Sequence, residues 1–283
     1  MKHKRAITIT VAVVAAAALA VGGVVAWSIA HKQPLPLSEQ CSARVGGQTT
    51  TITLEQARNA AIIAGVSVQR GLVPRAASIG LTTAYQESGI RNLDHGHADS
   101  LGLFQQRPSK GWGTPEEVTD PWYSSAAFYK ALVRVKDWQT RDLGDVAQAV
   151  QRSAYPDAYD KHVANGRTLA SALAGETPAS FTCAIRSTSP ADPDGLAEFL
   201  TKTYGKKASV QVGVAQLTVT ASSPAAAWSV AEAAVATTKQ YGVASVALGG
   251  YRWTFTPWSA PSWAAIDDVD ADARVVTIML VGK

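Results

Sequence analysis

The sequence has little net charge, only two cysteines and no internal repeat. Its formal charge is +4, and Lys2, Lys4, Arg5 and Lys32 account for all of it, so 22 basic residues balance 22 acidic ones beyond position 32. A protein that binds nucleic acid usually presents an excess of positive charge to the phosphates. The balance therefore argues against nucleic acid as a partner.

Charge is also missing from residues 6–30, an apolar run behind a basic N-terminus. A run of this length can cross the ~30 Å hydrocarbon core of a membrane as a helix, and the basic flank orients the N-terminus to the cytoplasm. We expect a cytoplasmic tail at 1–5, a transmembrane signal anchor at 6–30 that holds the protein on the cell membrane, and an extracytoplasmic remainder. The alternative is a signal peptide cleaved after Ala30, which would release a secreted protein.

The two cysteines, Cys41 and Cys183, bracket the middle of the chain. Two cysteines in an exported protein usually pair, because the compartment is oxidising. The sequence therefore predicts a disulfide, with two separate thiols as the alternative.

Turn residues and helix caps divide the rest of the chain into a linker and two domains. The segment HKQPLPLSEQ at 31–40 has two prolines and no apolar periodicity, which predicts an extended tether. Helix starts and apolar periodicity then predict an all-α domain over 41–186. The start signals are Thr53 with Gln56, Pro74, Thr114 with Glu117, and Asp120 with Pro121, the last helix reaching Trp138.

The composition changes at SPADPDG, which indicates a domain boundary near 187. Beyond it, helical and alternating patterns are mixed, and Gly249-Gly250 between two apolar runs is a hairpin signal. We predict a small α+β sandwich over 187–283. The sequence assigns it no activity; an envelope protein partner is one expectation for it.

Glu87 is the residue whose position indicates chemistry. It lies in the last turn of a helix predicted to run from Pro74 to Gly89. The C-terminal end of a helix disfavours a negative charge, and partial burial acts in the same direction. Glu87 is therefore predicted to hold its proton near neutral pH, as the acid of a glycosidase must.

Short motifs around Glu87 resemble the lytic transglycosylase branch of the lysozyme-like superfamily, which includes soluble lytic transglycosylases and resembles goose-type lysozymes. The resemblance covers about half of the chain, through residue 175. The motifs, in order, are Glu87-Ser88, the GLFQ of Gly102–Gln105, Asp120-Pro121, and Ala154-Tyr155. One departure is that the family's AYNAG is AYPDA here, at 154–158.

The resemblance implies a site and a reaction. Glu87 would be the sole catalytic acid and base, and the expected substrate-binding residues are Ser88, Gln105, Gln106 and Tyr155. The substrate would be the glycan strand of peptidoglycan, cut at the β-1,4 bond between N-acetylmuramic acid and N-acetylglucosamine to leave 1,6-anhydro ends, with no cofactor. Two alternatives remain: an inverting muramidase, if Asp94 or Asp99 lies across the cleft from Glu87, and a non-catalytic glycan-binding or scaffold protein of the envelope.

Two other polar or aromatic groupings receive weaker interpretations. DHGHAD at 94–99 offers imidazoles and carboxylates but lacks a distant third ligand motif, so no metal site is predicted. Four aromatic residues near the C-terminus could stack on sugar rings, although aromatics at alternating strand positions usually pack a core. They are Tyr251, Trp253, Trp258 and Trp263.

Overall fold

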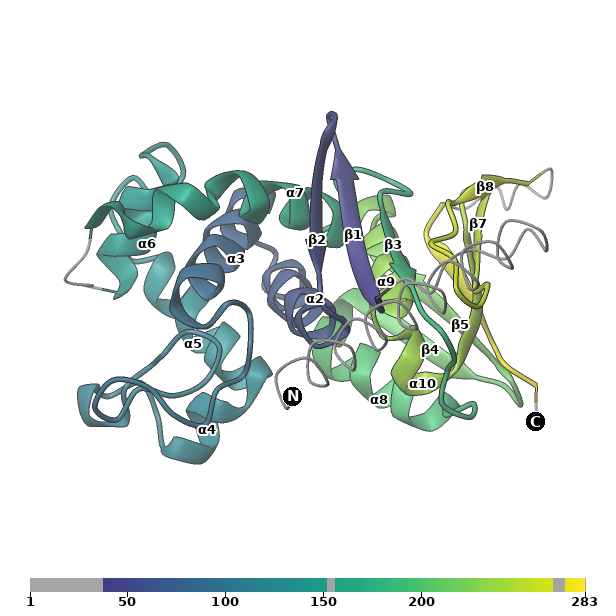
Figure 1. Cartoon of the computed structure of the whole chain (residues 1–283), viewed down its shortest axis with the longest axis horizontal. Helices are drawn as coiled ribbons and strands as arrows, with labels where there is room; N and C mark the ends of the chain where they lie inside the picture. Colours follow the sequence, from purple (N-terminus) through teal and green to yellow (C-terminus); the bar gives the residue numbers. More distant parts are fainter. Residues whose placement is uncertain (1–37, 152–155, 267–272, 283) are drawn as a thin grey trace, which may run out of the picture. The chain divides into compact units, whose positions relative to one another are not determined.

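The computed structural model describes residues 38–151, 156–266 and 273–282 (Figure 1). The predicted tail, the predicted signal anchor at 6–30 and most of the 31–40 linker lie outside these residues. Within the described ranges no helix combines the length and the apolar character needed to cross a membrane.

A three-stranded sheet corrects the predicted fold class. Strands β1 (Gln40–Val45) and β2 (Gln48–Ile52) form a hairpin, and β3 (Phe181–Ala184) pairs with the other edge of β1. All pairings are antiparallel, in the order β2-β1-β3. The first half of the chain is therefore not the all-α domain that the sequence analysis predicts.

The β1–β2 hairpin is explained by its turn glycines and by the burial of one face of β1. Gly46 and Gly47 both have positive φ values, 55° and 82°, as a two-residue hairpin turn requires. Cys41 and Ala43 are buried on one face of β1, while most of β2 is polar and exposed. A short strand with so few apolar residues gives a weak periodic signal.

The disulfide between Cys41 and Cys183 is confirmed. The two residues lie directly opposite each other in the β1–β3 register, with Cα atoms 3.9 Å apart, and both are fully buried. The bond joins the strand before the helices to the strand after them. A loop of this length corresponds to a stabilisation of about 4 to 5 kcal/mol in the chain-entropy model.

Between β2 and β3 the described residues form six α-helices and two 3-10 turns. They are α2 (Leu54–Gln69), α3 (Pro74–Ser88), η1 (Pro108–Lys110), α4 (Pro115–Thr119), α5 (Pro121–Leu132), α6 (Leu143–Gln151), η2 (Pro156–His162) and α7 (Val163–Leu173). Thr53 and Gln56 form the complete capping box expected at the start of α2. The helix after Asp120 ends at Leu132 rather than at the predicted Trp138, and the following residues form turns.

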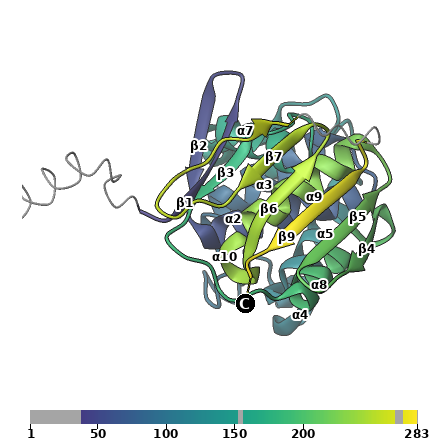
Figure 2. The same ribbon diagram turned by 90° about the vertical axis from the view of Figure 1, so that its right-hand side faces the viewer.

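The C-terminal part combines helices with a six-stranded antiparallel sheet in the order β4-β5-β9-β6-β7-β8. Figure 2 shows this sheet facing the viewer with the helices behind it. Its elements are α8 (Pro193–Tyr204), η3 (Gly205–Lys207), β4 (Ala208–Val212), β5 (Gln216–Ala221), α9 (Pro224–Ala236), α10 (Thr238–Tyr241), β6 (Val243–Leu248), β7 (Tyr251–Thr254), β8 (Ala264–Ala265) and β9 (Val275–Leu280).

Helix α9 joins the two parts of the chain. Nearly all of its side chains are buried, because it packs on α2, α7 and β3 on one side and on β5, β6 and β9 on the other. A helix that is apolar all round needs such cover on every face. The described residues from Glu39 onward consequently form one compact unit, and the packing crosses the boundary predicted near residue 187.

Two tryptophans fasten the C-terminal part to β3. The indole N–H of Trp253 donates to Thr182 Oγ1, and that of Trp263 donates to the Phe181 carbonyl, each at 3.0 Å. Both rings are buried, as the core interpretation expects, whereas Tyr251 and Trp258 are about 40% exposed. A sugar-stacking surface in this region would depend on Tyr251 and Trp258 alone among the four.

Helices α3 and α7 approach closely at Gly166. A Cβ atom there would lie 2.1 Å from Thr82 Oγ1 and 2.9 Å from the Thr82 backbone nitrogen. The missing side chain therefore lets α7 pack directly on the helix that carries Glu87.

Gly166→Ala should destabilise the protein by roughly 1 to 3 kcal/mol, the usual cost of overpacking. Urea unfolding at neutral pH measures the effect. Gly282→Ala is the matched control, because a Cβ at Gly282 meets no atom within 4 Å. Equal unfolding free energies for the two variants would show that the close approach of α3 and α7 is unimportant.

Candidate active site

The end of α3 places Glu87 at the surface of the helical part. Gly89 follows in the left-handed conformation, with φ 64°, and its N–H caps the carbonyls of Ala84 and Tyr85. Glycine adopts this conformation without steric cost and so ends the helix. Glu87 consequently lies in the last turn, as the sequence predicts, at the negative end of the helix dipole.

Two side chains from other elements contact the Glu87 carboxyl group. The hydroxyl of Tyr159, a fully buried residue of η2, donates to Glu87 Oε1 at 2.5 Å. Gln151, the last residue of α6, also hydrogen-bonds Glu87. Its Nε2 donates to the Phe104 carbonyl at 2.6 Å. Helix α3, helix α6, η2 and the loop at 101–106 therefore meet at one carboxyl group.

Burial and hydrogen bonding act on Glu87 in opposite directions. Glu87 is half-buried, and the resulting loss of hydration raises its pKa. The hydrogen bonds from Tyr159 and Gln151 favour the anion and lower its pKa, but burial is the larger effect, so the pKa stays above the ordinary value. Glu87 is therefore a carboxyl group whose pKa is raised by burial and which lies close to donors that stabilise its anion.

Ser88 serves the architecture of this site. It is buried, and its hydroxyl lies 2.8 Å from the Leu103 carbonyl and 3.1 Å from the Ala84 carbonyl, and accepts from the Arg91 N–H at 3.2 Å. These contacts tie the end of α3 to the loop at 101–106. Ser88 therefore holds the loop beside Glu87 instead of presenting its hydroxyl to a ligand.

The two glutamines of the predicted groove have different environments. Gln105 is half-buried at a positive φ of 48°, and its Nε2 donates to the His95 carbonyl at 3.2 Å. A Cβ at Gly96 would lie 1.9 Å from Gln105 Oε1, so the loop at 94–100 packs directly on the amide. Gln106 is 1% exposed and donates to the Ser124 carbonyl of α5 at 3.1 Å. The structure therefore places Gln106 in the core, away from any surface where a sugar could contact it.

Tyr155, the tyrosine that the resemblance selects, lies outside the described residues. The Ala-Tyr pair occurs twice in this segment, at 154–155 and again at Ala158-Tyr159, and the second tyrosine is the one that contacts Glu87. Neither Tyr159 nor Gln151 is among the site residues expected from the sequence. The repeated pair was the available signal for Tyr159, whereas a lone glutamine at the end of a helix gave none.

Asp94 and Asp99 are both engaged within their own loop. Asp99 accepts from Arg107 Nε and from the Ser109 N–H, each at 2.7 Å, and these contacts lower its pKa. Asp94 is exposed and lies 2.7 Å from His95 Nδ1. Among the residues that the structure describes, no three His, Cys, Asp or Glu side chains cluster as a metal site would require.

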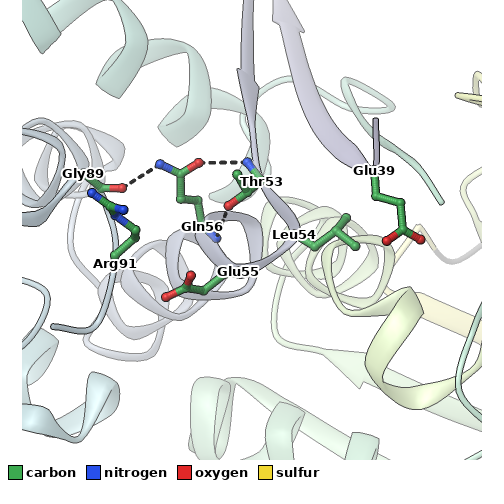
Figure 3. A pocket seen from close by; sticks show the side chains of 7 residues that line it. All are labelled: Glu39, Thr53, Leu54, Glu55, Gln56, Gly89 and Arg91. Atoms are coloured by element: carbon green, nitrogen blue, oxygen red, sulfur yellow. Dashed lines mark hydrogen bonds between the residues drawn. The ribbon is translucent and has the colours of Figure 1, made fainter. Parts of the chain in front are cut away.

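A hollow of about 490 Å³ opens beside the residues that follow Glu87 (Figure 3). Glu87 itself does not line it. The lining residues are Glu39, Thr53, Leu54, Glu55, Gln56, Gly89 and Arg91. Several of their polar groups already bond within the protein: Glu39 pairs with Lys239, and Gln56 bridges Thr53 and the Gly89 carbonyl. The hollow is a charged surface depression, and the acid chemistry belongs to the cluster at Glu87.

Glu87→Gln should stabilise the protein at neutral pH. A glutamate whose pKa is raised by folding contributes most below its unfolded pKa, and this contribution is lost as the pH rises through the folded value. The neutral amide avoids that loss, so its melting temperature should exceed that of the wild type by roughly 2 °C or more at pH 7. Calorimetry at pH 4 and pH 7 should show the difference only at pH 7; a variant less stable at pH 7 would contradict the charge argument.

Tyr159→Phe should raise the pKa of Glu87 further, because it removes a hydrogen bond that favours the anion. Carboxyl-carbon NMR titration of selectively labelled glutamate measures this pKa directly. Tyr123→Phe, an exposed position on α5, is the control and should leave it unchanged. A Glu87 pKa that is unaltered or lower in Tyr159→Phe would refute the contact.

Comparison with known proteins leaves the family open. No protein-family model matches the sequence, and no curated protein does either. The case for a function therefore rests on the geometry at Glu87 together with the motif resemblance.

Proposed function

We propose that this chain is an exported glycosidase of the lytic transglycosylase type that cleaves peptidoglycan glycan strands. The observation that carries the proposal is the half-buried carboxyl group of Glu87, whose pKa is raised by burial and which is held by Tyr159 and Gln151. A carboxylic acid that keeps its proton near neutral pH is what protonation of a glycosidic oxygen requires.

The reaction uses Glu87 twice. In the first step its proton passes to the oxygen that bridges N-acetylmuramic acid and N-acetylglucosamine, and the bond from that oxygen to the anomeric carbon breaks while the substrate's own N-acetyl oxygen bonds to that carbon. In the second step the Glu87 carboxylate takes the proton of the 6-hydroxyl of the same sugar. The 6-oxygen then bonds to the anomeric carbon and displaces the N-acetyl oxygen, leaving a 1,6-anhydro end.

The surroundings of Glu87 suit both steps. Burial favours the acid that the first step needs, and the donors Tyr159 and Gln151 stabilise the carboxylate that the second step needs. Asp99 is occupied by Arg107 and Ser109, and Asp94 is exposed beside His95, which argues against either as the general base of an inverting muramidase. A route that needs one carboxyl group fits these contacts better than a route that needs two.

The disulfide supports an extracytoplasmic location. Cys41 and Cys183 are bonded, and such bonds persist mainly in oxidising compartments. Peptidoglycan lies in such a compartment, so the proposed substrate and the proposed location agree. The proposal involves no cofactor.

The rival proposal is a non-catalytic envelope protein that grips glycan or a protein partner. The packing of Gln105 and Gln106 favours it, because both amides already donate to backbone carbonyls of the protein itself. Activity on peptidoglycan separates the two proposals.

Purified wild-type protein should clear a peptidoglycan zymogram, and Glu87→Gln should not. Glu198→Gln, at an exposed position on α8, is the matched control and should clear as the wild type does. Clearing by Glu87→Gln would contradict the proposed mechanism. A lack of clearing by the wild type would favour the envelope scaffold. Mass spectrometry of the released fragments should find anhydro ends; reducing ends would identify a hydrolase instead.

A further inference from the structure

The uncharged side chain of Gln151 contacts both the 101–106 loop and the Glu87 carboxyl group. The residue ends α6, and its amide lies between the Phe104 carbonyl, at 2.6 Å, and the carboxyl group of Glu87. One side chain thus joins the loop at 101–106 to the proposed acid.

The Phe104 carbonyl is a fixed point. The Phe104 ring is fully buried and stacks on Phe128, with ring centres 4.6 Å apart and planes 13° apart. The preceding carbonyl, that of Leu103, is held by Ser88 at 2.8 Å, and Leu101 and Gln106 pair through both of their backbone groups. A carbonyl only accepts hydrogen bonds, so the Gln151 amide must direct its NH₂ group toward it.

This constraint gives Gln151 a fixed polarity. An amide NH₂ carries two hydrogens, so the group that donates to Phe104 also offers a donor to Glu87. A rotation of the amide that offered its oxygen to Glu87 would break the Phe104 contact. The hydroxyl of Tyr159 differs, because a hydroxyl can donate or accept and can follow a change in the protonation of Glu87.

We propose that Gln151 is the positioning residue of this site: anchored on the Phe104 carbonyl, it holds the Glu87 carboxyl group at a fixed place relative to the 101–106 loop through a donor of fixed polarity. The inference rests on the proposed function for its effect on catalysis. Its structural content, a link from the loop to Glu87, stands apart from activity.

For the reaction, the Gln151 donor restricts the direction in which Glu87 can carry its proton. The Gln151 NH₂ group cannot accept a hydrogen bond, so the Glu87 proton cannot be directed at it. Correct orientation of a catalytic group contributes strongly to rate. Loss of Gln151 should therefore reduce the rate of the chemical step more than it weakens binding of the glycan.

Gln151→Met tests the proposal, because methionine has a similar length and no donor. The apparent kcat on soluble glycan fragments should fall roughly tenfold or more, with KM within about twofold of the wild type. The upper limb of the pH–rate profile, where Glu87 loses its proton, should move to higher pH, because a donor to the anion is lost. Asp145→Asn, an exposed position on the same helix, should change neither quantity.

NMR titration of the Glu87 carboxyl carbon separates a failure of this inference from a failure of the proposed function. The pKa of Glu87 should be higher in Gln151→Met than in the wild type, whether or not the protein cleaves glycan. Wild-type protein without activity but with this pKa difference would sink the proposed function and leave the positioning contact standing. An unchanged pKa in a folded Gln151→Met would overturn the inference.

Gln151→Asn provides the second variant, should methionine prevent folding. It keeps an amide but is one methylene too short to span from α6 to both partners, so it should resemble Gln151→Met in the pH profile and in the Glu87 pKa. A variant with wild-type kcat and pKa values would show that Gln151 only packs, and would overturn the proposal.

Discussion

Burial and hydrogen bonding act in opposite directions on the carboxyl group of Glu87, and the proposed site requires both. Burial raises the pKa of Glu87, while hydrogen bonds from Tyr159 and Gln151 stabilise its anion. A fully buried carboxyl group without donors would resist ionisation, and a solvated one would not keep its proton. Only the intermediate case suits a group that must first give a proton and then take one back.

The rest of the fold can be understood as support for that arrangement. Gly166 lets α7 pack on α3, and Ser88 fastens the end of α3 to the loop that carries Phe104. The disulfide closes the ends of the helical region, and α9 packs beneath α2 and α7 from the C-terminal side. The C-terminal sheet thus shares a core with the region that holds Glu87.

Some features of the fold could be predicted from single residues and their sequence neighbours. The capping box at Thr53, the left-handed glycine at position 89 and the cysteine pair follow from single residues and their neighbours, and the structure contains all three. The hairpin before α2 escaped notice because its strands are short and mostly polar. Tyr159 and Gln151 escaped because they meet Glu87 only through tertiary packing, 72 residues away in the case of Tyr159.

A crystal structure of the Glu87→Gln variant with a bound peptidoglycan fragment would show where the glycan lies relative to residue 87. We expect a glycosidic oxygen within about 3 Å of the residue 87 side chain, the distance that proton transfer requires. The fragment bound instead in the hollow beside Arg91, or at Tyr251 and Trp258, with no sugar near residue 87, would contradict the proposed function.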